Sequence, residues 1–165
     1  MELVTDTAQG LLDRLLDFEI EVAFVAGPVA HVALDTKAVF SEELVLVMPP
    51  SFPPMARLHA INGSTVIAFK VGCAYRRYLE DWMREQGITP GGVIESSSYH
   101  VILACVAAGA GFAAVPRSVL DAVAIKGECR LHPLTGPASK VDTLLTWRVD
   151  YTSAKLDALQ EILNA

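Results

Sequence analysis

The stretch ESSSYHVILACVAAGAGFAAVP, residues 95–116, decides the fold that the sequence predicts. Its serine triplet, Ser96-Ser97-Ser98, can accept hydrogen bonds from the first N–H groups of a helix. The apolar run from Val101 to Ala108 predicts that helix, which has no charged face and has to be covered by a sheet or by a partner. Gly109 and Gly111 end it, because glycine tolerates the left-handed conformation of a helix terminus.

The segments on either side of this helix predict strands. Val93 and Ile94 precede the serines, and residues 112–115 follow the glycines and end at Pro116. A strand, a helix and a strand in that order form a βαβ crossover, which implies a parallel sheet. Ligands of open parallel sheets bind beyond the carboxyl ends of the strands, so we expect the serines to lie at a binding edge.

Composition excludes several classes of protein. A chain of 165 residues with 52% hydrophobic and 19% charged residues is typical of a folded α/β core and excludes disorder. A net charge of −6 makes it a poor nucleic-acid binder on its own. It has no apolar run of the roughly 18 residues that a membrane span needs. Its first ten residues lack the pattern of a signal peptide, and its three scattered cysteines favour a reducing compartment, so we expect a cytoplasmic protein.

Periodicity and turn residues predict the remaining elements. The other predicted helices cover residues 8–16, 74–86 and 117–123 and a last helix capped by Ser153, and the other strands cover residues 2–4, 22–26, 40–48, 65–69, 129–133 and 143–149. Four prolines between Pro49 and Pro54, and the turn at residues 135–137, predict two crossings between lobes. Lobe I then comprises residues 1–49 and 137–165 and lobe II residues 50–136, with a small-molecule cleft between them.

Four segments resemble one known family in their order along the chain. They are VAFVAGP (22–28), EELVLV (42–47), IAF with GCAYRRYLEDW (67–69 and 72–82), and the stretch 95–116. Together they resemble the effector-binding domain of LysR-type transcriptional regulators, and the Gly-Cys-x-Tyr-Arg form is similar to a glutamate-operon-regulator-like branch. The resemblance implies an α/β fold of the type 2 periplasmic-binding-protein kind: two Rossmann-like lobes with mostly parallel sheets, joined by a two-crossing hinge. The family's N-terminal DNA-binding domain and the first strand and helix of its effector domain have no counterpart in this sequence.

The resemblance also implies a function. Such a domain binds a small-molecule effector in the cleft, pairs as an antiparallel homodimer, and acts on DNA through a separate helix-turn-helix domain, without catalysis, metal or cofactor. The effector would contact the polar residues that follow the strands of the two lobes. These residues are Thr5, Asp6, Thr7, Gly72, Cys73, Ala74, Tyr75, Ser96, Ser97 and Ser98.

Some of these residues also have simpler interpretations. Residues 5–7 can cap the helix that follows them, and Ser98 can cap its own. Cys73, at a helix start, is either an ordinary residue of the cleft wall or a redox-sensitive thiol. Arg76 and Arg77 either pair with the acids four residues later or hold an anion such as a carboxylate near the helix start. The sequence alone leaves both interpretations of Cys73 and both interpretations of the two arginines open.

Other chemistries fit the sequence less well. The order of Gly109-x-Gly111 is wrong for a dinucleotide loop, which needs strand, glycines and then helix. A catalytic set of Ser98, His100 and Asp121 lacks a nucleophile-elbow pattern, and the cysteines and histidines lack metal-ligand spacing. The alternative functions are a solute-binding receptor and an enzyme on the same scaffold. The sequence encoded upstream would distinguish a regulator from a receptor, because a helix-turn-helix indicates a regulator and a secretion signal indicates a receptor.

Overall fold

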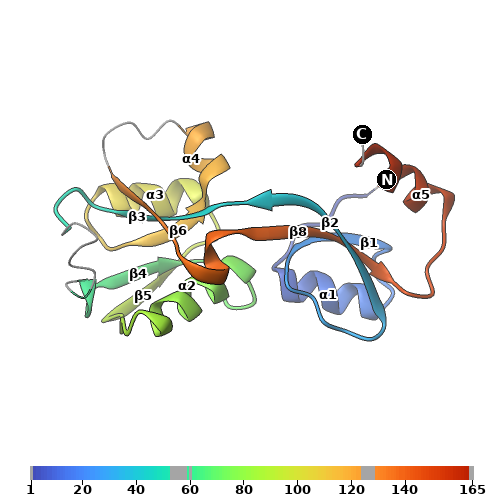
Figure 1. Ribbon diagram of the computed structural model, residues 1–165, viewed down its shortest axis with the longest axis horizontal. Helices are drawn as coiled ribbons and strands as arrows, with labels where there is room; N and C mark the ends of the chain where they lie inside the picture. The colour runs from blue at the N-terminus through green and yellow to red at the C-terminus, as the bar shows by residue number, and fades with distance from the viewer. Residues whose placement is uncertain (1, 53–58, 60, 124–128, 164–165) are drawn as a thin grey trace. The chain divides into compact units, whose positions relative to one another are not determined.

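The computed structural model describes residues 2–52, 59, 61–123 and 129–163 (Figure 1). The chain forms two compact units: unit 1 holds residues 1–41 and 141–165, and unit 2 holds residues 42–140. Within the described residues, no helix has both the length and the apolar character that crossing a bilayer requires.

Unit 1 is a three-stranded sheet with helices. It contains α1 (Ala8–Leu16), β1 (Val22–Ala26), β2 (Leu34–Glu42), β8 (Val141–Arg148) and α5 (Ala154–Ile162). The strand order is β1-β8-β2, and β1 pairs antiparallel with β8. The amphipathic face of α1 covers one side of this sheet, where Leu15 packs against Ala23, Val25 and Leu34 in a buried cluster.

Unit 2 is the larger unit and combines short sheets with helices on both sides of them in sequence. It contains β3 (Leu44–Met48), β4 (Thr65–Ala68), α2 (Ala74–Glu85), β5 (Gly92–Glu95), α3 (Tyr99–Ala107), β6 (Ala113–Pro116), α4 (Arg117–Val123), β7 (Arg130–Pro133) and the 3-10 helix η2 (Gly136–Ser139). Its strands have the orders β6-β3-β7 and β4-β5.

A short parallel bridge joins these two sheets. Val66 of β4 pairs with Phe112, the residue before β6. Ile67 N donates to Phe112 O at 2.8 Å, and Phe112 N donates to Thr65 O at 3.1 Å. Gly111 allows this approach, because a Cβ there would lie 2.2 Å from Thr65 O. The bridge therefore extends the sheet of unit 2 from β7 through to β5.

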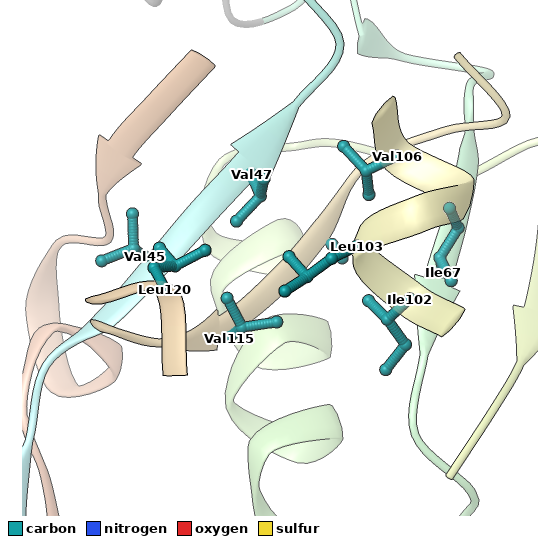
Figure 2. Close-up of a cluster of buried hydrophobic side chains, with 9 residues drawn as sticks. Val45, Val47, Ile67, Ile102, Leu103, Val106, Val115 and Leu120 are labelled. Carbon is teal, nitrogen blue, oxygen red and sulfur yellow. The ribbon is translucent and has the colours of Figure 1, made fainter. Parts of the chain in front are cut away.

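The core of unit 2 lies between α3 and the strands. Figure 2 shows Ile102, Leu103 and Val106 of α3 pointing toward the side chains of β3, β4 and β6. These three helix residues are at most 1% exposed, whereas Val101 on another side of the helix is 49% exposed. The predicted apolar helix is thus covered by the sheet on one side only.

Most predicted elements form within one or two residues of their expected bounds. The sequence of polar cap, helix, glycine stop and strand is confirmed by α3 and β6, with Gly109 at a φ of +84° after the helix. The predicted strand 40–48 forms as two strands, because Glu43 interrupts it, and its first part extends back to Leu34. Residues 2–4 do not form a strand, since they have no pairing partner among the described residues.

The strand directions differ from the mostly parallel pairing that was predicted. The parallel pairing of β4 with β5 is confirmed, but β3 pairs antiparallel with both β6 and β7, and β1 with β8. A crossover helix imposes parallel pairing only on the strands that it connects. The strands β3 and β8, which follow the two passages between units, are not bound by that constraint.

The passages between units also differ from the proline-rich positions predicted. The chain changes unit after Ser41 and after Lys140 instead of near Pro49 and Pro137. The reason is that β3 pairs with β6 and β7 and so belongs to unit 2. Pro53 and Pro54, which the prediction also used, lie outside the described residues.

Candidate functional site

Two of the predicted polar segments leave the sheet of unit 2 at the same edge. In the parallel pair β4–β5, Ala68 lies opposite Glu95, so both strands end together. Residues 72–75 follow β4 after a short loop, and Ser96 follows β5 directly and donates its N–H to Ala68 O at 3.0 Å. The structure thus brings these two segments to one edge of the sheet, and their role in binding stays a prediction. We call residues 72–75 and 96–99, with Phe69, the carboxyl edge.

Two serines of the carboxyl edge accept hydrogen bonds from backbone N–H groups. Ser98 is the N-cap of α3, and its hydroxyl oxygen accepts from Val101 N at 3.5 Å. The hydroxyl oxygen of Ser96 accepts from Ser98 N at 3.2 Å, and Ser97 is exposed. A hydroxyl that accepts one hydrogen bond still has its own proton to donate. The capping interpretation of Ser98 is therefore confirmed, and all three hydroxyls remain suitable donors to a ligand.

The other segment is the start of α2. Gly72 has a φ of +90°, which favours glycine, and it turns the chain into Cys73, the N-cap residue. The Cys73 side chain makes no capping hydrogen bond, whereas Thr7, Ser98 and Ser153 cap α1, α3 and α5. Cys73 thus supplies no side-chain acceptor to the N–H groups at the start of α2. Ala74 is buried at 4% exposure, so it can offer a ligand only its backbone.

Two aromatic residues complete the carboxyl edge, and the sequence did not single them out. The rings of Phe69 and Tyr99 meet edge to face with their centroids 4.9 Å apart. Burial raises the pKa of the Tyr99 hydroxyl, and the charges of Tyr75, Cys73 and Glu42 raise it further. Tyr99 therefore keeps its proton at neutral pH and is a hydrogen-bond donor. Its place directly after the serine triplet was the signal that could have identified it.

Arg76 lies beside the carboxyl edge and donates to two carboxylates and one backbone carbonyl. Its Nε donates to Glu80 at 2.7 Å, as the four-residue spacing predicted, and its Nη1 donates to Glu95 and to Phe69 O. The hydrogen bond to Glu80 raises the pKa of the guanidinium, and the hydrogen bond to Glu95 adds to this effect. Two carboxylates thus surround one cation, which leaves Arg76 poorly suited to neutralise a third.

The third predicted segment belongs to unit 1. Thr5 and Asp6 are exposed and precede α1, and the hydroxyl of Thr7 caps that helix by accepting from Gly10 N at 3.1 Å. The capping interpretation of this segment is confirmed, with Thr7 in the role of the cap. Because this segment and the carboxyl edge lie in different units, each is treated as a separate surface.

The remaining chemistry of the described residues is sparse. They contain no group of three or more His, Cys, Asp or Glu side chains placed to hold a metal ion. His100, considered with Ser98 for catalysis, lies exposed on α3. A shallow hollow of about 400 Å³ lies at the far end of α2 from the carboxyl edge, and it is lined by Glu80, Met83, Arg84, Gly87, Ile88, Thr89 and Pro90.

Comparison with known proteins identifies the class. The family model of the LysR substrate binding domain matches residues 1–165, and this chain belongs to that family. It is 31% identical to the HTH-type transcriptional regulator GltR of Bacillus subtilis over 150 residues, which are 91% of this chain and 51% of that protein. It is 30% identical to the HTH-type transcriptional regulator SoxR of an Arthrobacter species over 167 residues, 57% of that protein. The chain therefore spans about half the length of the curated relatives that it matches.

Solved structures agree on the fold. The regulatory domain of CcmR from Synechocystis, solved in complex with 2-PG, covers 98% of this chain and 80% of its own with a TM-score of 0.80 and 16% identity. The effector binding domain of a BenM variant gives a TM-score of 0.77 at 18% identity and covers 98% of this chain and 78% of its own. The fold is thus the two-lobed, periplasmic-binding-protein-like α/β fold of LysR regulatory domains.

Proposed function

We propose that this chain is the effector-sensing part of a bacterial LysR-type transcription regulator and that the carboxyl edge of unit 2 contacts the effector. Family membership over the whole chain and relatives named as transcriptional regulators support the first part. The observation that carries the second is the meeting of two parallel strand ends with two helix starts, one of which has no side-chain cap. DNA would be bound by a helix-turn-helix domain outside this sequence, in the cytoplasm.

The donors of the carboxyl edge favour an effector with an anionic group, such as a small carboxylate. The hydroxyls of residues 96–98 and the protonated Tyr99 offer hydrogen atoms to an acceptor, and the Cys73 side chain does not cap the start of α2. A helix start attracts negative charge because its N–H groups are unpaired and its dipole is positive there. The anion would be held by these neutral groups instead of by Arg76.

Substitution at Cys73 tests this proposal. The free energy of unfolding of unit 2 is measured by the fluorescence of Trp82, a buried residue of that unit, in a Trp147→Phe background. The measurement is repeated with acetate, succinate, citrate, glutamate and benzoate, each added at matched ionic strength. Binding at one hundred times Kd should stabilise unit 2 by about 2.7 kcal/mol. Cys73→Asp supplies a permanent cap, so it should raise stability by about 1 kcal/mol without ligand and remove the response.

The matched control is Cys73→Ala, which supplies no cap and should keep the response to the carboxylate. Equal stabilisation of the Asp and Ala variants by the same acid would contradict an anion at the start of α2. No response of the unsubstituted chain to any acid of the set would contradict the carboxylate class.

We also propose that the chain carries no catalytic activity and assembles as a homodimer. The support for assembly is the exposed side of the otherwise apolar α3, where Val101 is 49% exposed and Ala104 is exposed as well. Exposed apolar side chains that are neighbours on one helix are typical of interaction surfaces. Val101→Asp should shift the protein toward monomer in sedimentation, and Val93→Asp on β5, where the side chain is also 49% exposed, serves as the control; an unchanged dimer in both variants would exclude this face.

A further inference from the structure

One guanidinium joins three elements at the carboxyl edge. Arg76 of α2 donates to the carbonyl oxygen of Phe69, just after β4, at 3.0 Å, and to the carboxylate of Glu95, the last residue of β5. Its side chain is only 14% exposed. A contact of this kind links the ends of two strands to the start of a helix through a single side chain.

These partners lie next to the proposed effector contacts. The segment 72–75 is enclosed between Phe69 and Arg76, so their hydrogen bond closes that loop. Glu95 immediately precedes the serine triplet, so its ion pair fixes the point from which the triplet leaves the sheet. The backbone adds one hydrogen bond between the ends of β4 and β5, from Ser96 N to Ala68 O.

The pairing of Arg76 with Glu80 alone would not have this consequence. That pair lies within one helix, and a pair at this spacing stabilises only the helix that contains it. The contacts with Phe69 and Glu95 are made across the sheet edge, and they use the Nη1 atom, which the Glu80 contact leaves available. The two sets of contacts therefore have separable effects.

We infer that Arg76 is a positioning residue, which holds the loop 72–75 and the serine triplet in their mutual arrangement and does not itself bind the effector. This inference rests on the proposed function of the carboxyl edge. It predicts that loss of the Glu95 contact loosens the serine triplet, whereas loss of the Glu80 contact leaves it unchanged.

The test compares Glu95→Ala with Glu80→Ala, since each removes one carboxylate partner of the same arginine. Backbone amide exchange of residues 96–98, measured by NMR on the full chain without ligand, should be about three- to tenfold faster in Glu95→Ala. In Glu80→Ala it should change by less than twofold. Arg76→Met should loosen both residues 72–75 and residues 96–98, while the Trp82 unfolding transition measures any general loss of stability.

Equal exchange in the Glu95→Ala and Glu80→Ala variants would overturn the inference, as would faster exchange spread evenly over unit 2. Binding of succinate is measured on the same variants, and its affinity should fall in Glu95→Ala and not in Glu80→Ala. The exchange data need no ligand, so they can contradict the positioning role of Arg76 without contradicting effector binding at the carboxyl edge. A chain that binds none of the acids would instead contradict the proposed ligand, with the exchange result unaffected.

Discussion

Gly111→Ala should be among the most damaging single substitutions in unit 2, although Gly111 needs no unusual φ. An added Cβ would lie 2.2 Å from Thr65 O and 2.9 Å from Thr65 C, both of them backbone atoms. Ordinary contacts between such atoms need about 3.5 Å, so the two strands would have to separate by about 1 Å. Such a shift breaks the hydrogen bonds of 2.8 and 3.1 Å that join β4 to the start of β6.

The expected cost follows from these contacts. Overpacking a rigid site costs about 1–3 kcal/mol, and each lost backbone hydrogen bond adds about 1 kcal/mol, which gives about 3–5 kcal/mol in all. Gly109→Ala is the matched control, because it makes the same chemical change two residues earlier where a Cβ would meet nothing within 4 Å. Its φ of +84° should cost only about 1–2 kcal/mol.

The chain has two tryptophans, Trp82 in unit 2 and Trp147 in unit 1, so each unit has its own reporter. Urea unfolding of the Trp147→Phe background, followed by Trp82 fluorescence, gives the free energy of unfolding of unit 2. Gly111→Ala should lower it by at least 1 kcal/mol more than Gly109→Ala does. A smaller loss for Gly111→Ala than for Gly109→Ala would refute the close approach of β4 and β6.

Three other perturbations test the cores and the pH dependence. Leu103→Ala should lower the unfolding free energy of unit 2 by about 2–5 kcal/mol, because this side chain of α3 is 1% exposed and packs against the sheet; urea unfolding measures the loss, and a change under about 1 kcal/mol would contradict its packing. Arg148→Met removes hydrogen bonds of 2.9 and 3.0 Å to Leu15 O and Ile20 O at the end of α1, so unit 1 should lose about 1–3 kcal/mol in urea unfolding followed by Trp147 fluorescence in a Trp82→Phe background. Burial lowers the pKa of His132, so the unfolded chain binds more protons than the folded one, and the stability of unit 2 should fall as the pH drops below about 6.5. His132→Leu should make this decline shallower, and equal pH slopes in both proteins would exclude the histidine as its source.

Local patterns predicted most of the elements because they depend on neighbouring residues alone. The helix 117–123 and the strand 22–26 form with the predicted bounds, and Ser98 caps α3 as its position predicted. The same patterns contain no information about strand direction, since a side-chain period of two is common to parallel and antiparallel strands. The antiparallel pairing of β3 was therefore not visible in its apolar sequence.

The carboxyl edge was predictable in its backbone and not in its side chains. A strand followed by serines and a helix indicates the edge from sequence alone, and the structure brings residues 72–75 to the same edge. The pairing of Arg76 with Glu95 joins residues nineteen positions apart, a spacing that no helix or strand period selects. The contact of Phe69 with Tyr99 likewise depends on how α3 lies over the strands. Such contacts follow from tertiary packing, which local sequence patterns do not predict.

An anion site on a chain with a net charge of −6 requires that nearby carboxylates be held by partners of their own. Three of the carboxylates around the carboxyl edge have a cationic partner: Glu80 and Glu95 are paired with Arg76, and Glu43 accepts two hydrogen bonds from Arg117. Glu42 accepts one hydrogen bond from the neutral hydroxyl of Ser118 at 2.8 Å and keeps its charge, which acts on Tyr99. The bond from Arg117 lowers the pKa of Glu43, so that carboxylate stays charged and bound at neutral pH. Under the proposed function, neutral donors of the carboxyl edge would face the effector, and specificity for an acid would come from the geometry of hydroxyl and N–H groups instead of from net charge.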